Sequence, residues 1–84
     1  MTPEMIEKFI DNKGRKDLEV HIHFKQRSTI KGLFIRTADY DQLKSKNFWR
    51  IVAGPKIDEW KKTKDINLAK IFSGTEITRL SENN

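Results

Sequence analysis

The sequence predicts a mainly β fold, in which a short N-terminal helix precedes a strongly bent, five-stranded antiparallel barrel of the SH3-like type. Three observations lead to this prediction. Apolar residues recur at helical spacing near the start of the chain, they alternate with polar residues in later short segments, and a glycine interrupts the second of these segments. The 84 residues have the length of one domain, so we expect a single domain over residues 1–84 with the barrel over about 18–80.

The N-terminal helix is expected over about residues 3–12. Thr2 can cap its first turn, Pro3 suits the first helical position, and Glu4 lies near the positive end of the helix dipole. Gly14 ends the helical pattern. The apolar side chains share one face, formed by Met5, Ile6, Phe9 and Ile10.

Two strands are expected next. Apolar and polar residues alternate over 18–24, and after a turn a second strand over 30–37 contains Gly32. A glycine inside a strand favours a sharp bend or a close backbone approach. Leu33 and Ile35 make the second face of this strand apolar, so we expect the N-terminal helix or another subunit to cover it.

Three further strands complete the predicted barrel. We expect a polar loop over 38–47, then a strand over 48–54 that ends at Gly54-Pro55. The charged segment 56–65 is interpreted as a long connection or an extended hairpin. A fourth strand over 66–72, a short fifth strand over 75–80 and a frayed tail follow.

The sequence offers little support for catalysis. It has no cysteine, which excludes disulfides, zinc knuckles and thiol nucleophiles, and it has no nucleophile elbow or phosphate-binding glycine loop. His21 and His23 project from the same side of one strand, but no third metal ligand accompanies them, so we expect a solvated surface there. We therefore predict no enzyme activity, metal, cofactor or small-molecule substrate.

The sequence predicts no targeting signal. The N-terminal segment is too acidic and too interrupted in apolar content for a signal peptide, and no apolar run approaches the ~20 residues of a membrane span. We expect a cytoplasmic protein with no membrane contact.

The net charge of +5 is concentrated in one part of the chain. Residues 42–70 contain eight basic and three acidic residues, whereas the remainder is balanced. Clustered positive charge attracts polyanions such as nucleic acids. A solvated, lysine-rich loop that keeps a small protein soluble is the alternative interpretation.

Two short motifs resemble those of the Sm and Sm-like family, which includes the Hfq-like RNA chaperones. In "IKGLFIRTADYDQL" Gly32 is followed by the acidic Asp39 and the amide Gln42, and in "IFSGTEITRL" Gly74 follows an apolar pair. Ser73 stands where many family members carry arginine. Asn47, directly before an apolar segment, competes with Gln42 for the amide position of the first motif.

The resemblance implies a ring of about five to seven copies, closed by pairing the fourth strand of one subunit with the fifth of the next. It also implies single-stranded RNA bound at the pore, where Tyr40 stacks on a base and Gln42 or Asn47 bonds its edge. Asp39 then braces the loop. The remaining RNA contacts are assigned to the phosphate-binding Lys44, Lys46 and Lys70, and to the turn residues Ser73 and Gly74.

Two other functions are consistent with the same residues. The chain could be a non-catalytic, SH3-like structural or protein-interaction module that docks a partner on Leu33, Ile35 and the Trp60 segment. It could also bind double-stranded DNA through the basic segment. Trp49 and Trp60 are interpreted as packing or interface residues rather than base stackers.

Overall fold

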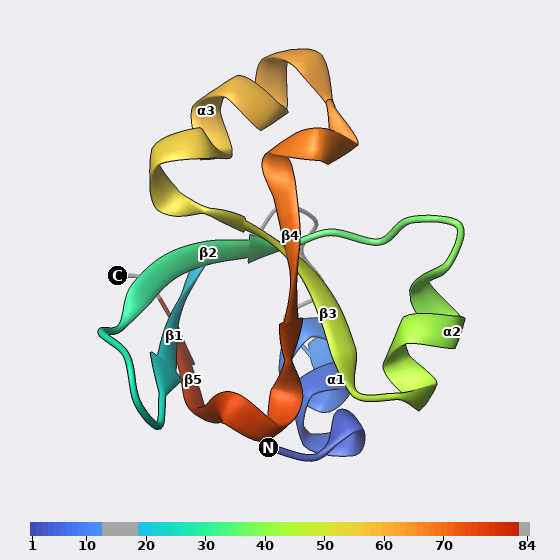
Figure 1. Ribbon diagram of the computed structural model, residues 1–84, viewed down its shortest axis with the longest axis vertical. Helices are drawn as coiled ribbons and strands as arrows, with labels where there is room; N and C mark the ends of the chain where they lie inside the picture. Colours follow the sequence, from blue (N-terminus) through green and yellow to red (C-terminus); the bar gives the residue numbers. More distant parts are fainter. Residues whose placement is uncertain (13–18, 83–84) are drawn as a thin grey trace.

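The computed structural model describes residues 1–12 and 19–82, so the predicted helix end at Gly14 and strand start at Leu18 lie outside the described residues. The predicted N-terminal helix and five antiparallel strands are confirmed. The elements, in chain order, are α1 (Pro3–Asn12), β1 (Glu19–Phe24), β2 (Ile30–Phe34), α2 (Tyr40–Ser45), β3 (Phe48–Ala53), α3 (Gly54–Thr63), the 3₁₀ turn η1 (Ile66–Leu68), β4 (Ala69–Ser73), the 3₁₀ turn η2 (Gly74–Glu76) and β5 (Ile77–Glu82) (Figure 1).

The five strands form one antiparallel sheet in the order β4-β3-β2-β1-β5. The sheet curls around an interior (Figure 1), but β4 and β5 are its two edges and no ladder joins them within the described residues. The sheet is therefore bent as predicted but not closed. In β2, a Cβ on Gly32 would come within 2.7 Å of Ile22 Cδ1 and 2.8 Å of Ile51 Cγ2, so only glycine fits without a shift of the core.

The expected polar loop over 38–47 is wrong, because most of it forms the helix α2. Its last turn is closed by backbone hydrogen bonds from Lys46 to Leu43 and from Asn47 to Lys44. Asn47 then adopts a left-handed conformation with φ of 61°. Asparagine tolerates that conformation better than most residues, and it commonly ends a helix there.

The expected connection or hairpin over 56–65 is also wrong, because it forms the helix α3. Pro55 occupies the first turn, where a missing backbone N–H costs nothing, and Lys64 ends the helix with φ of 56°. Ile57 is buried and Trp60, one turn later, is half-buried. With α2 and α3 present, the protein is a mixed α/β fold rather than a mainly β one.

Two apolar clusters lie on opposite faces of the sheet. The inner cluster includes Val20, Ile22 and Ile51 of the strands together with Ile6 of α1. The outer cluster packs Leu33, Ile35 and Val52 against Ile57 of α3. The cover that was predicted to come from the N-terminal helix or from another subunit is therefore supplied by α3.

Among the described residues, no helix has the length and apolar character needed to cross a membrane.

Candidate nucleic-acid interface

Tyr40, expected as a base-stacking residue in a loop, lies half-buried in the first turn of α2. Its ring meets Trp49 edge-on with the centroids 6.0 Å apart, and the Arg36 guanidinium lies 4.8 Å from its centroid. Its hydroxyl donates to Glu7 Oε2 at 3.4 Å, and burial raises the pKa of the phenol. The ring thus has packing partners within the chain.

The other predicted residues in α2 and directly after it differ in exposure. Lys44 Nζ donates to Glu7 Oε2 at 2.7 Å, which lowers the pKa of the carboxyl, raises that of the ammonium and joins α2 to α1. Gln42 and Lys46 are exposed. Among the described residues, Gln42 on α2 and Lys46 directly after it are the members of this predicted set that are exposed and form no ion pair.

Asp39, expected as a loop brace, accepts hydrogen bonds from the Thr37 hydroxyl and from Arg50 Nη2, the latter at 2.7 Å. The Arg50 hydrogen bond is the main reason that the pKa of Asp39 falls from 3.8 to about 2. These contacts tie the segment after β2 to the start of α2 and to β3.

Asn47 and Gly74 lie together, so the segment before β3 meets the turn after β4. The Gly74 N–H donates to the Asn47 carbonyl at 2.8 Å. The Asn47 side chain accepts from Trp49 Nε1 at 2.8 Å and donates to the Met1 carbonyl at 2.9 Å. A Cβ on Gly74 would lie 2.1 Å from Asn47 Oδ1, so the contact requires glycine.

Ser73 and Lys70, the last two predicted residues, both belong to β4. The Ser73 hydroxyl lies 2.7 Å from Thr75 Oγ1 and accepts from the Thr75 N–H at 3.3 Å, which caps the turn η2. Lys70 is exposed and pairs with Ile51 across the ladder, on the inner face of the sheet.

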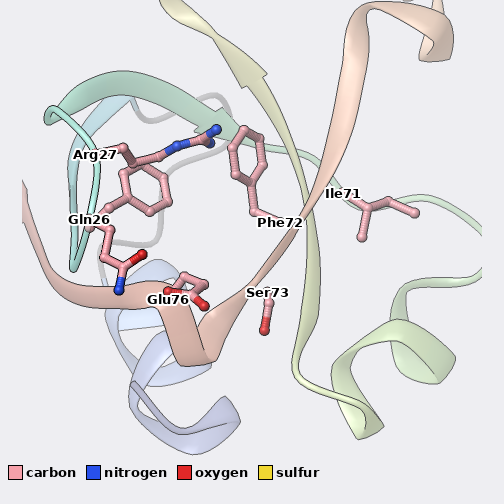
Figure 2. A pocket seen from close by; sticks show the side chains of 7 residues that line it. Gln26, Arg27, Ile71, Phe72, Ser73 and Glu76 are labelled. Atoms are coloured by element: carbon pink, nitrogen blue, oxygen red, sulfur yellow. The ribbon is translucent and has the colours of Figure 1, made fainter.

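An aromatic and cationic cluster that the sequence did not suggest lies where the β1–β2 turn approaches β4. The rings of Phe24 and Phe72 have centroids 5.7 Å apart. The Arg27 guanidinium lies 5.4 Å from the Phe24 centroid and 5.7 Å from that of Phe72. Figure 2 shows Arg27 and Phe72 pointing toward one another from separate segments, whereas Ile71 points away. The cluster thus lies between the β1–β2 turn and the edge strand β4.

Two hollows flank this cluster, each with a volume of about 400 Å³, which is within the range of ~300 to 1,000 Å³ typical of ligand pockets. They share Arg27, Ile71 and Phe72, and together we call them the seam groove. The first hollow is also lined by Phe24, Gln26, Ser73 and Glu76, and the second by Ile30, Ile51, Ala53, Lys56, Leu68 and Lys70. Three basic side chains and one acidic side chain therefore line the groove.

Sequence reasoning missed the groove because its members come from distant segments. Phe72 lies on the inner face of the sheet, opposite Trp49. The alternation of side chains along the strand is the part of this placement that the sequence indicates. The position of Arg27 cannot be inferred from the sequence, because it depends on how the five-residue turn after β1 folds over the sheet. An arginine in a turn next to a strand-terminal phenylalanine is the only local signal.

His23 of β1 contacts two hydroxyl groups. His23 Nε2 lies 3.2 Å from Ser81 Oγ, and His23 Nδ1 lies 3.1 Å from Thr29 Oγ1. His21 precedes it by two residues and shares its face of the strand. In the part of the chain that the structure describes, no group of three histidine, cysteine, aspartate or glutamate side chains could hold an ion.

Comparison with protein-family models, with curated proteins and with solved structures found no match to this chain.

Proposed function

We propose that the protein binds single-stranded RNA in the seam groove and does so as an Sm-like assembly of several copies. The observation that carries the proposal is the Arg27 guanidinium over the rings of Phe24 and Phe72, with the lysines of the second hollow beside it. Aromatic rings stack on unpaired bases, each contributing ~1 to 3 kcal/mol, and a guanidinium adds cation–π attraction.

Single-stranded RNA suits this groove better than a duplex. The rings lie inside a hollow beside a strand edge, so a base must leave its own stack to reach them, and single strands do this at the lowest cost. Lys56 and Lys70 line the neighbouring hollow, where they can neutralise the phosphates on either side of that base.

The proposed site overlaps only part of the residue set expected from the family resemblance. Ser73 and Lys70 line the seam groove. Tyr40, Lys44, Asn47 and Gly74 instead have intramolecular partners. We assign them to holding the segments around the groove, and in the proposed ring the exposed Gln42 and Lys46 supply further contacts to RNA.

The proposed ring contains about five to seven copies. Its support is that β4 and β5 are both free edges of the sheet within the described residues, and unpaired edges are templates for strands of a neighbouring copy. Pairing β4 of one copy with β5 of the next would bring the seam grooves of successive copies around one axis.

The protein-interaction alternative loses the surface on which it was based. Leu33 and Ile35 are buried beneath α3 within the chain, and Trp60 belongs to that helix rather than to a loop. Leu33 and Ile35 are thus not exposed as an apolar docking face.

Fluorescence anisotropy with labelled oligonucleotides tests the proposal. We expect salt-sensitive binding of a single-stranded ten-nucleotide RNA that is tighter than binding of duplex RNA or duplex DNA. Phe72→Leu keeps an apolar side chain but removes the ring, and should weaken binding about 5- to 150-fold. Lys70→Gln should reduce the salt slope by about 1.

Lys62→Gln is the matched control, because this exposed α3 lysine does not line the groove. It should leave affinity nearly unchanged. Absence of salt-sensitive binding to the single strand, or tighter binding to duplex DNA, would contradict the proposal. Equal effects of the Lys62 and Lys70 substitutions would place the binding elsewhere on the basic surface.

A further inference from the structure

We propose that the seam groove selects guanine, with Arg27 and Glu76 reading two edges of one base. This inference rests on the proposed binding of single-stranded RNA and names the base that the same groove prefers. Its basis is the arrangement of an arginine, an aromatic pair and a carboxylate around one hollow.

The first hollow of the groove has two polar ends and an apolar middle. Figure 2 shows the Arg27 guanidinium at one end, near Phe72, and Gln26 and Glu76 at the other. The aromatic faces fix the plane in which a base could stack. The guanidinium and the carboxylate then determine which hydrogen-bonding groups the base must present at its rim.

Glu76 is positioned but not neutralised. Its backbone carbonyl accepts a hydrogen bond from the Lys25 N–H at 3.0 Å, which holds residue 76 against the β1–β2 turn. Among the described residues, no side chain donates a hydrogen bond to its carboxylate or forms an ion pair with it. A free carboxylate repels phosphate, so it weakens non-specific attraction of RNA and favours a contact to base donors.

Guanine alone presents complementary groups to both ends. Its O6 and N7 are paired acceptors that an arginine binds bidentately, and its N1–H and N2–H₂ are paired donors for a carboxylate. Uracil presents one N–H between two carbonyl oxygens, which face a carboxylate unfavourably. Adenine and cytosine each offer one amino group beside an acceptor nitrogen. These three bases leave groove groups unpaired, and unpaired polar groups cost binding free energy.

The test uses single-stranded nine-nucleotide RNAs that consist of uridines except at the central position, which is G, A, C or U. We expect the G-containing RNA to bind the wild-type protein about tenfold more tightly than the others. Glu76→Gln should bring the four affinities close together, because the amide no longer offers two acceptors. Glu59→Gln, the same change on exposed α3 outside the groove, should retain the preference.

Base analogues test the same contacts without altering the protein. Replacing the central guanine by hypoxanthine removes N2–H₂ and should abolish most of the preference, as should 7-deazaguanine, which removes N7. These ligands keep the inference testable if Glu76→Gln fails to fold, which circular dichroism reports.

The outcomes separate the two proposals. Salt-sensitive binding with equal affinity for all four RNAs overturns guanine selection and leaves RNA binding in place. A uniform gain of affinity in Glu76→Gln also overturns it, because the carboxylate then acts only by repulsion. If no RNA binds, both the proposed function and the guanine selection are wrong.

Discussion

Asp39 accepts hydrogen bonds from Thr37 and Arg50, and through them it connects the segment after β2 with α2 and β3. The side chain is 35% exposed, so water screens part of its interaction with Arg50. The pKa of the carboxyl nevertheless falls to about 2, mainly because Arg50 donates to the ionised form. A lowered pKa in the folded state makes stability depend on pH.

We expect Asp39→Asn to remove part of the pH dependence of stability in acid. In the wild-type protein the ionised carboxylate stabilises the fold above pH 3.8, and this contribution is lost as the pH falls through about 2. Urea unfolding at a series of pH values measures it. The wild-type protein should be the more stable of the two at pH 5, and the difference should shrink toward pH 2. A difference that is constant over this range would contradict the expected coupling.

Asn47 and Gly74 show how far residue-level reasoning extends. The sequence indicated a turn at Gly74 and a possible amide contact by Asn47. It did not indicate that the Gly74 N–H donates to the Asn47 carbonyl, or that Asn47 Oδ1 accepts from Trp49. These partners are remote in the chain or depend on a rotamer, so spacing alone cannot identify them.

At the level of elements, α1 and the five strands were predictable because each has its own periodicity, 3.6 for the helix and 2 for the strands. The helix α3 was missed because charged residues dominate its surface and only Ile57 and Trp60 face inward. These two apolar residues are three positions apart and follow Pro55, and this pattern is the local sequence signal of a helix. The short helix α2 has no buried residue and hence no strong apolar period.

Ile57→Ala tests whether α3 is an integral cover of the sheet. Ile57 is 2% exposed and packs on Leu33, Ile35 and Val52. Truncation leaves a cavity in the outer cluster, so we expect unfolding free energy to fall by about 2 to 5 kcal/mol in urea titrations.

Ile66→Ala is the matched control, because the same truncation is made at a side chain that is 43% exposed. Its cost should stay within about 0.5 kcal/mol. Equal losses for the two variants would show that α3 does not shield the outer face in solution.

At the scale of the whole molecule, the sheet curls but does not close into a barrel, and β4 and β5 are its two edges (Figure 1). Ile71 on β4 is 49% exposed; it helps to line the seam groove, and its side chain points away from Arg27 and Phe72 (Figure 2). An exposed apolar residue on an edge strand favours pairing with another chain, whereas a lysine there disfavours it.

Ile71→Lys is therefore expected to reduce assembly of the proposed ring. Native mass spectrometry, with and without a short oligoribonucleotide, should detect several copies per particle for the wild-type protein and a shift toward monomer for the variant. Ile66→Lys adds the same charge at an exposed isoleucine outside the strands and should leave assembly unchanged. Monomeric wild-type protein, free and RNA-bound, would contradict the ring.

The sequence by itself determined the N-terminal helix, the five strands, the close backbone approach at Gly32 and the concentration of positive charge, because local periodicity and composition encode these features. Only the tertiary structure decided that α3 covers the second face and that Arg27 lies over Phe24 and Phe72. The physical reason is that both depend on how separate segments pack, where burial and shape across the whole chain outweigh the preferences of any short stretch.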